Sequence, residues 1–252
     1  MRKIAIANQK GGTAKSTTTI HLGAGLAQLG KKVLLVDMDP QGHLAEGFGL
    51  PAGELTKEIS AVLDNKLTLP QILVNVRPNL DLAPSNIRLS YLEAFLFTKY
   101  QRENRLKRAL KSVTGQYDYL LIDSPPSLGV LTVNALSAAD FVLVPMACEF
   151  YAMLGVSLLL QTIEEMKAEI NPDLEIMGIL PTRYTHTIHS REVLERTKAE
   201  LGNTLRIYSQ VIPESVRFRE AAALGKTIYE HDPENPGAGA YQDLTKEVIS
   251  HG

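Results

Sequence analysis

The sequence contains only one cysteine, Cys148, in 252 residues. A single cysteine cannot close a disulfide within the chain, so no disulfide framework is expected and a reducing, cytoplasmic setting is favoured. It also argues against an iron–sulfur cluster, which needs several thiolates, unless two chains each contribute their only cysteine.

An excess of charge of either sign is also lacking. The chain carries 26 Lys and Arg residues against 28 Asp and Glu residues, a formal charge of −2, and 21% of its residues are charged. This balance excludes a basic field over the whole molecule, so any binding to nucleic acid must use a local patch. With 44% hydrophobic residues, the composition is that of a soluble globular protein with a sizeable core.

Long apolar runs are missing as well. The longest, Phe141–Leu160, is interrupted by Pro145, Glu149 and Gly155, which is typical of a buried strand followed by a buried helix and not of a membrane span. Near the N-terminus only four apolar residues stand together, so a signal peptide is not expected. The C-terminal segment has Lys246 as the one basic residue among its apolar positions, which favours a docked helix over a membrane-targeting tail.

The most informative stretch lies at residues 4–20. Ile4–Ala7 is apolar and predicts a buried strand, Lys10–Ser16 is rich in small residues and predicts a loop, and Thr17–Leu29 predicts a helix. A strand, a small-residue loop and a helix N-terminus together form a cradle of backbone N–H groups, to which the helix dipole adds positive potential. Such a cradle suits a phosphate chain.

The loop departs from the ordinary Walker A pattern G-x-x-x-x-G-K-[ST], because Gln9 and Ala14 stand at its two glycine positions. Lys15 remains as a point charge for the outer phosphates, and Ser16 remains as a hydroxyl for Mg²⁺. Lys10 is an additional cation. Taken alone, the Lys-Ser-Thr sequence could be a solvated turn and Lys10 a solvated loop charge, but the flanking strand and helix and the second lysine favour phosphate binding.

Apolar runs typical of buried parallel strands alternate with helical patterns along the rest of the chain. The helix candidates include Leu106–Ser112, Leu154–Ala168 and His189–Leu201. The strand candidates are Ile4–Ala7, Lys32–Asp37, Leu80–Leu82, Tyr119–Asp123, Phe141–Pro145, Glu175–Leu180 and Ile207–Ile212. This order predicts an α/β fold, a doubly wound and mostly parallel sheet, in a single domain spanning residues 1–252.

Ligands of such sheets bind beyond the carboxyl ends of the strands. The charged residues that stand near the ends of apolar runs are Lys10, Lys15, Asp37, Asp39 and Asp123. The topology therefore predicts that these side chains converge on one edge of the sheet. Asp37 and Asp39 would point the same way as strand residues, and their charges would need Mg²⁺ or lysine nearby. As alternatives, they could be strand-end caps or turn formers, and Asp123 a strand end broken by proline.

Three motifs occur in a fixed order: K-G-G-x-x-K-S-T, then L-L-V-D-M-D-P-Q-G, then L-L-I-D-S-P-P-S. The combination resembles the ParA/MinD group of deviant-Walker ATPases, most closely its ParA/Soj branch, from Ile4 to the segment Val211–Ile228. The resemblance implies a P-loop NTPase of the deviant Walker A type with ATP and Mg²⁺ as cofactors. Ala14 departs from the family, which usually has glycine there. An added methyl would narrow the loop, although alanine is small enough that nucleotide binding is expected to survive.

The resemblance also assigns roles to residues. It implies a magnesium site at Ser16, Asp37 and Asp123, in which Asp37 supports the metal shell and Asp123 reaches Mg²⁺ through water or holds Ser16. Asp39 would orient or deprotonate the attacking water. The loop residues implied to contact the nucleotide are Lys10, Gly11, Gly12, Thr13, Ala14, Lys15, Ser16 and Thr17.

Catalysis is implied to combine charge in cis with charge in trans. Lys15 would supply positive charge within the subunit, and Lys10 would reach across a two-fold interface to the partner's nucleotide, as an arginine finger does. The resemblance further implies that adenine is contacted by the loops Pro181–Arg183 and Pro213–Ser215. Within these loops, Pro213 is the residue predicted to bind the nucleotide. Both prolines could instead simply end strands.

Two basic sets stand out. A solvated face is the usual meaning of the first, on a predicted helix: Lys99, Arg102, Arg105, Lys107, Arg108 and Lys111. The second contains Arg191, Arg196, Arg217, Arg219 and Lys226. ParA/Soj proteins bind DNA non-specifically through corresponding segments, so the resemblance implies DNA contacts at Arg191, Arg217, Arg219 and Lys226. One of Arg217 and Arg219 could instead lock the loop, because residues two apart face alike only in an extended stretch. No base-reading motif is visible, so phosphate contacts and steep salt dependence are expected.

The leading hypothesis is a ParA/Soj-like ATPase that partitions or positions a cargo. ATP would make it a homodimer that binds nucleoid DNA, and a ParB-like or cargo-adaptor protein would stimulate hydrolysis that is slow by itself, below the ~1–100 s⁻¹ of kinases. The expected location is cytoplasmic and nucleoid-associated, without a membrane partner. One alternative is a P-loop transferase or synthetase of the dethiobiotin-synthetase type, although no second set of residues for a small acceptor is visible. The other is a MinD-like membrane-cycling ATPase, which the C-terminal segment disfavours.

Overall fold

The computed structural model describes residues 1–149 and 152–250. Within these ranges, seven strands form one sheet in the order β3-β4-β2-β5-β1-β6-β7. The parallel strands are β1 (Arg2–Ile6), β2 (Val33–Asp37), β4 (Leu80–Ala83), β5 (Tyr119–Asp123), β6 (Phe141–Ala147) and β7 (Glu175–Thr182). Strand β3 (Val74–Arg77) pairs antiparallel with β4 at one edge. The predicted mostly parallel α/β fold is confirmed.

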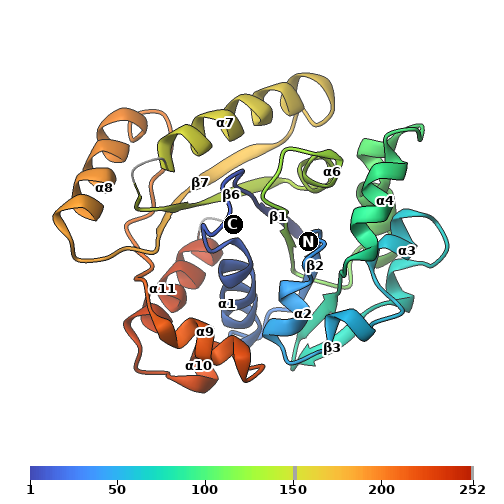
Figure 1. Ribbon diagram of the computed structural model, residues 1–252, viewed down its shortest axis with the longest axis horizontal. Coiled ribbons are helices and arrows are strands. Elements are labelled where there is room, and N and C mark those ends of the chain that lie inside the picture. The colour runs from blue at the N-terminus through green and yellow to red at the C-terminus, as the bar shows by residue number, and fades with distance from the viewer. Residues whose placement is uncertain (150–151, 251–252) are drawn as a thin grey trace.

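Helices cover both faces of the sheet (Figure 1). One face carries α1 (Lys15–Gln28), α2 (His43–Gly47), α9 (Val216–Ala223), α10 (Ile228–His231) and α11 (Pro236–Ser250). The other carries α3 (Ile59–Leu63), α4 (Arg88–Leu96), α5 (Arg105–Ala109), α6 (Val130–Ala138) and α7 (Ala152–Glu169). Helix α8 (Ile188–Leu201) packs near the carboxyl end of β6. Short 3₁₀ turns span Ala52–Glu54, Leu69–Gln71, Arg102–Asn104 and Leu110–Val113.

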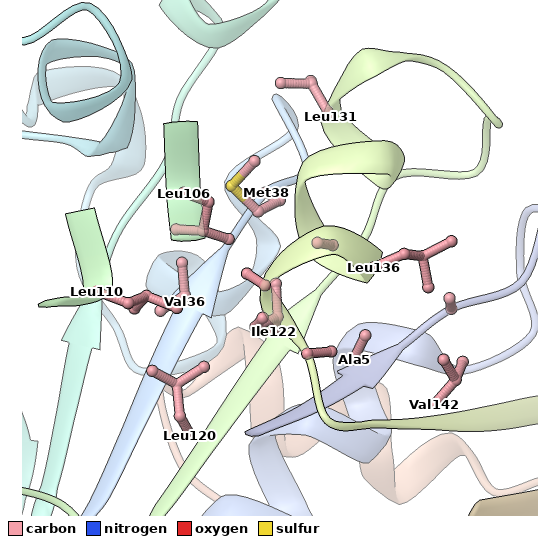
Figure 2. Close-up of a cluster of buried hydrophobic side chains, with 14 of the residues drawn as sticks. Ala5, Val36, Met38, Leu106, Leu110, Leu120, Ile122, Leu131, Leu136 and Val142 are labelled. Atoms are coloured by element: carbon pink, nitrogen blue, oxygen red, sulfur yellow. The ribbon is translucent and has the colours of Figure 1, made fainter. Parts of the chain in front are cut away.

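The two layers of core follow from the alternation of side chains along buried strands. In β2, Leu34 and Val36 belong to the core beneath α3–α7, whereas Val33 and Leu35 belong to the core beneath α1 and α11. All four are fully buried, which explains why the strand reads as a continuous apolar run. Figure 2 shows part of the first core, where strand residues meet side chains from α5, its following turn and α6: Ala5, Val36, Leu120 and Ile122 with Leu106, Leu110, Leu131 and Leu136.

One predicted strand is wrong: Ile207–Ile212 makes only an isolated bridge to β7, between Ile207 and Ile179. Tyr208 N–H donates to the Ile179 carbonyl and Ile212 N–H to the Pro181 carbonyl, both at 2.9 Å. Between these two bonds β7 advances by two residues while the second segment advances by four, so the segment bulges outward and a ladder cannot continue.

The edge strand β3 was not predicted. Its sequence Val-Asn-Val-Arg alternates, but its side chains are only half-buried or exposed, so it lacks the continuous apolar run that marks the central strands. It joins β4 through Pro78 and Asn79, and Asn79 has the left-handed backbone (φ 61°) that a tight turn requires. The predicted helix Leu106–Ser112 is a short α-helix followed by a 3₁₀ turn.

His21 ties the first helix to the C-terminal helices. Its Nδ1–H donates to the Thr17 carbonyl at 2.7 Å, and its Nε2 accepts the Ile228 N–H at 2.9 Å, so the buried ring is a neutral tautomer. It stacks on Tyr241 with ring centroids 5.2 Å apart and meets the edge of Phe218 at the same distance. Burial lowers the pKa of His21 to about 4.

We expect His21 to make the free energy of unfolding depend on pH. The unfolded chain binds a proton near the ordinary pKa of 6.5, whereas the folded protein keeps His21 neutral down to about 4, so stability falls as pH falls through this window. The loss attributable to His21 should reach about 3 kcal/mol at pH 4. Urea denaturation of the wild type and of His21→Gln across pH 7 to 4 should diverge by this amount. The exposed His186→Gln serves as control, and parallel curves for wild type and His21→Gln would contradict the assignment.

Candidate active site

The carboxyl ends of three neighbouring strands bring the predicted residues together. Asp123, the last residue of β5, lies in register with Asp37 at the end of β2 and with Ile6 at the end of β1. The loop that follows β1 therefore begins beside both aspartates, and Lys15 at the start of α1 lies near Asp123 and Asp39. The predicted convergence follows directly from the parallel order of the strands.

The loop between β1 and α1 is held by buried polar contacts. Asn8 donates to the Pro145 carbonyl at 2.7 Å and accepts the Lys10 N–H at 3.0 Å, which fixes the start of the loop to β6. Thr182 donates to the Thr13 carbonyl at 3.0 Å, which fixes its middle to β7. The loop is therefore shaped before any ligand binds.

Ala14 adopts a left-handed conformation with φ 65° and ψ 31° at the N-cap of α1. In this region a β-carbon is disfavoured by roughly 1–2 kcal/mol, and glycine is the residue without that strain. Gly12, two residues earlier, also has a positive φ of 72°. Alanine at this position therefore brings backbone strain, and the narrowing of the loop by its methyl group stays a prediction.

Lys15, Ser16 and Asp123 form a compact cluster at the N-terminus of α1. Lys15 is 7% exposed, and burial lowers its pKa, while the nearby Asp123 and Asp39 act in the opposite direction. Its Nζ donates to the Lys10 carbonyl at 3.3 Å. Ser16 Oγ donates to Asp123 Oδ2 at 2.6 Å. The cluster thus places an ammonium, a hydroxyl and a carboxylate at the mouth of a backbone N–H cradle.

Asp123 is fully buried, and burial raises its pKa to about 7, against the hydrogen bond from Ser16 and the charge of Lys15. Thr19 also donates to its second oxygen, at 3.3 Å. Within residues 1–149 and 152–250, no group of three or more His, Cys, Asp or Glu side chains is arranged to hold a metal by itself. Oxygen ligands from one hydroxyl and one carboxylate nevertheless fit Mg²⁺, which usually completes its shell with water and substrate phosphates.

Asp37 makes the contacts of a structural cap. Its Oδ1 accepts the Asp39 N–H at 2.9 Å and its Oδ2 accepts the Leu44 N–H, in the first turn of α2, at 3.2 Å. Complete burial, and then the neighbouring Asp123 charge, raise its pKa well above the ordinary value. These bonds support the capping role that the sequence left open, and a direct role in the metal shell stays a prediction.

Asp39 follows β2 and lines the pocket beside the phosphate loop. Its Oδ1 accepts the Gln41 N–H at 3.0 Å, and its carbonyl accepts the Ser85 hydroxyl. The carboxylate is 6% exposed. The backbone and one carboxylate oxygen are therefore fixed, and the role of Asp39 in orienting a water molecule stays a prediction.

Lys10 does not point toward the Asp123 cluster. Its Nζ lies 2.6 Å from Glu149 Oε2, and this contact lowers the pKa of Glu149. The other oxygen of Glu149 lies 3.0 Å from Arg183 Nη1, which also donates to the Gly12 carbonyl at 3.2 Å. Arg183 Nε in turn donates to Glu214 at 2.8 Å. The Lys10 side chain is therefore held by a residue of its own subunit.

Two adjoining pockets flank the loop. One, of about 750 Å³, is lined by the loop, Asp39, the α2 region and, from α9, Ala222 and Ala223. The second, of about 360 Å³, is lined by Thr17, Pro213 and Phe218 among others, and contact of Pro213 with a base stays a prediction. Both volumes lie within the range of about 300–1,000 Å³ that is usual for small-molecule sites. Pro181, in contrast, lies inside β7, and of Pro181–Arg183 only Arg183 follows the strand.

The predicted DNA-binding residues fall on separate elements. Arg191 is exposed in the first turn of α8, whereas Arg217 and Arg219 lie on α9 and Lys226 follows it, and Figure 1 shows α8 and α9 apart. Arg217 Nη1 lies 2.7 Å from Glu220, and its Nε lies 3.6 Å from Asp232.

Arg219 is more exposed, with 74% of its side chain accessible and Glu214 at 3.9 Å. Because α9 is helical, the two arginines point apart, and Arg217 is the one that braces its surroundings.

Sequence reasoning missed Glu149, Ala222 and Ala223, and it named Arg183 only as part of a loop implied to contact adenine. Glu149 follows the apolar strand β6 just as Asp123 ends β5, and the same rule applied there would have found it. Arg183 follows β7, but nothing in its neighbours marks its left-handed backbone (φ 50°). The contribution of Ala222 and Ala223 carries no sequence signal, since small residues on a helix have many uses.

The fold and the site together define a class. A doubly wound sheet with a lysine-bearing loop after its central strand, and an aspartate at the end of a neighbouring strand that accepts the loop's serine hydroxyl, is a P-loop NTPase. The lysine at position 10 marks the deviant Walker A type.

Comparisons with known proteins narrow the class. A family profile described as AAA domain matches residues 1–176. The sporulation initiation inhibitor protein Soj of Bacillus subtilis (strain 168) is 44% identical, over 99% of this chain and 98% of its own length. The chromosome partitioning protein ParA of Caulobacter vibrioides (strain NA1000 / CB15N) is 42% identical, over 99% of this chain and 94% of its own length.

A crystal structure from Mycobacterium smegmatis is also similar throughout. It is named cobyrinic acid a,c-diamide synthase and contains an ATP analogue and magnesium. Its TM-score is 0.88 at 38% identity, and the match covers 100% of this chain and 95% of the other. This chain belongs to the AAA-domain family matched above, and specifically to the ParA/MinD family of partition and positioning ATPases.

Proposed function

We propose that the chain is an ATP-dependent molecular switch that hydrolyses ATP slowly and couples nucleotide binding to dimerisation and to non-specific DNA binding. The observation that carries the ATPase function is the Lys15–Ser16–Asp123 cluster at the mouth of the preformed loop. Family membership and the ATP analogue with magnesium in the Mycobacterium smegmatis structure support ATP and Mg²⁺ as the cofactors.

The residues of the chain act mainly by positioning. When bound, Mg²⁺ would neutralise part of the negative charge on the phosphate oxygens during phosphoryl transfer. Ser16 and Asp123 would hold the Mg²⁺ ion beside the phosphates. Lys15 would neutralise charge on the outer phosphates. Asp39, braced through Gln41 and Ser85, would accept a hydrogen bond from the attacking water.

Lys10 is the residue proposed to couple ATP binding to dimerisation. In trans, its ammonium would add charge to the partner's terminal phosphate, so ATP would become part of the interface between subunits and hydrolysis would release them. The ion pair with Glu149 must first be exchanged. Both side chains are about one-third or more exposed, so screening by solvent leaves the pair worth about 1 kcal/mol at most, and the exchange is inexpensive.

The DNA-binding face is assigned to α9 and its C-terminal loop. Arg219 and Lys226 are exposed, and the same helix lines the phosphate pocket through Ala222 and Ala223. A ligand in that pocket would therefore contact α9, the helix that carries the basic side chains. A ParB-like or cargo-adaptor protein is the proposed trigger of hydrolysis, and a nucleoid location would follow from DNA binding.

We expect Arg219→Ala combined with Lys226→Ala to weaken ATP-dependent binding to duplex DNA by about 10-fold or more. Each cation that contacts a phosphate should also contribute about 1 to the slope of log Kobs against log salt, so the slope should become shallower. Fluorescence anisotropy with labelled DNA, titrated with salt in ATP, ADP or no nucleotide, measures both quantities. Lys66→Ala, an exposed cation beside α3, is the control. Equal affinity for DNA in ATP, in ADP and without nucleotide would contradict the proposal that the chain is a nucleotide-dependent switch.

A second candidate is a synthetase, because the similar Mycobacterium smegmatis structure is named a cobyrinic acid a,c-diamide synthase. A synthetase would consume ATP in proportion to a carboxylic acid acceptor and would need no DNA. Phosphate release measured with cobyrinic acid and glutamine, and separately with DNA, distinguishes the two.

Within the described parts of the chain, no helix is long and apolar enough to cross a membrane.

A further inference from the structure

Aromatic side chains gather on the outer surface of α4 and the turn that follows it. Among the described residues, the exposed large hydrophobic side chains of this segment are Ile87 (55% exposed), Tyr91 (73%), Phe95 (51%), Phe97 (56%) and Tyr100 (95%). We call these five residues the α4 patch. Elsewhere in residues 1–149 and 152–250, the exposed large hydrophobics are single aliphatic side chains and include no aromatic ring.

The α4 patch is a helix face without a partner. Ile87, Tyr91 and Phe95 are spaced by four residues, so they form a row along one side of α4. The opposite side of the helix, with Leu89, Leu92 and Leu96, is buried in the core. An ordinary surface helix would carry polar residues on its outer side. Aromatic side chains in such a row are the residues that most often anchor a protein interface.

The patch is set in a strongly basic surround. Residues 87–111 contain seven Lys and Arg residues against two Glu residues, in a chain that is slightly acidic as a whole. Lys99 Nζ lies 4.0 Å from the centroid of the Phe95 ring. Arg102 donates to the Phe97 carbonyl and Arg108 to oxygens of Gln101, so both guanidinium groups are satisfied by neutral acceptors.

The two acidic residues of this segment do little to neutralise the cations. Glu93 is half-buried and burial raises its pKa, while Glu103 accepts a hydrogen bond from Asn104. Among the ion pairs of the described residues, none involves a cation of residues 87–111. The charge around the α4 patch therefore remains available to an acidic partner.

We propose that the α4 patch is the docking surface for an acidic, amphipathic helical segment of another protein. Its apolar side would pack along Ile87, Tyr91 and Phe95, and its carboxylates would face Lys99, Arg102 and the exposed cations of α5. Duplex DNA fits less well, because it would use the cations and leave the apolar row in water. The proposal does not depend on nucleotide hydrolysis or on the dimer, so its test can fail while the ATPase function stands.

The test uses the full chain and three labelled synthetic peptides of about 20 residues. One is an amphipathic helix with Leu and Phe on one side and Glu on the other, the second has Lys in place of Glu, and the third scrambles the first. Fluorescence anisotropy should show binding of the acidic amphipathic peptide alone. The double variant Tyr91→Ser/Phe95→Ser should weaken it about 10-fold or more, and Lys99→Glu should weaken it further. Ile188→Ser, at an exposed aliphatic residue on α8, should leave it unchanged.

Two parallel measurements separate other occupants of the patch. Sedimentation of the same variants reports self-association, and anisotropy with a labelled DNA duplex reports nucleic-acid binding. Equal affinity for the acidic and scrambled peptides, or a double variant that binds the acidic peptide as tightly as the wild type, overturns the proposal. The proposal is also overturned if Tyr91→Ser/Phe95→Ser reduces only self-association or only DNA binding and leaves peptide binding unchanged. Circular dichroism of each variant confirms that the fold is retained, since all substituted side chains are at the surface.

Discussion

Replacing Asp39 with alanine is expected to abolish ATP hydrolysis while leaving ATP binding intact. The carboxylate is almost fully buried beside the phosphate loop, and its backbone is held by Asp37 and Ser85, so its removal deletes the group that orients water without disturbing the loop. A positioned base contributes about 10²–10⁴-fold, so phosphate release should fall at least about 100-fold. Because the nucleotide is then not consumed, gel filtration with ATP should show a persistent dimer that binds DNA.

Asp64→Ala is the matched control for this experiment. Asp64 is a carboxylate at the end of α3, paired with Lys66 at 2.8 Å and remote from the loop. It should leave phosphate release and dimerisation unchanged. A monomeric Asp39→Ala protein in saturating ATP would count against the dimer, and undiminished hydrolysis would count against the role of Asp39.

The second large effect is expected from Lys10→Gln. In the structure Lys10 is bound to Glu149 and not to the Lys15 cluster, so the substitution should leave nucleotide affinity within about 2-fold, close to wild type. If the ammonium acts on the partner's nucleotide as an arginine finger does, stimulated turnover should fall by about 10³-fold. Equilibrium binding of a fluorescent ATP analogue and phosphate release in the presence of the partner protein measure the two quantities separately.

Lys3→Gln offers a close comparison. Lys3 is also part exposed and also forms an ion pair at 2.6 Å, with Asp140, but it lies at the opposite end of β1. Removing it should affect stability slightly and stimulated turnover not at all. Stimulated hydrolysis by Lys10→Gln at the wild-type rate would refute action in trans, and loss of nucleotide binding would show that Lys10 serves its own subunit.

Much of the fold could be predicted because its central strands are buried on both faces. Val33–Val36 and Tyr119–Ile122 appear as unbroken apolar runs, and the chain alternates them with helices. The convergence of Asp37, Asp39 and Asp123 needed no more than the rule that parallel strands end at one edge.

The features that the sequence did not predict share a physical cause. At the edge beyond β7, Tyr208 and Ile212 are buried like strand residues, yet the spacing of their hydrogen bonds prevents a ladder, and no pattern of hydrophobicity encodes that spacing. Similarly, the strain at Ala14 and the partner of Lys10 depend on backbone angles and on Glu149, far away in the sequence. Local patterns predict burial, whereas long-range geometry decides pairing.

Helix α9 has a consequence for energetics. Its Ala222 and Ala223 line the larger pocket beside the loop, its Phe218 and Arg219 line the adjoining pocket, and the Arg219 side chain is 74% exposed. If ATP raises the affinity for DNA through this helix, thermodynamic linkage requires DNA to raise the affinity for ATP by the same factor. A subunit already on the chromosome would then bind ATP more tightly than one in solution, and the same coupling free energy would raise both affinities.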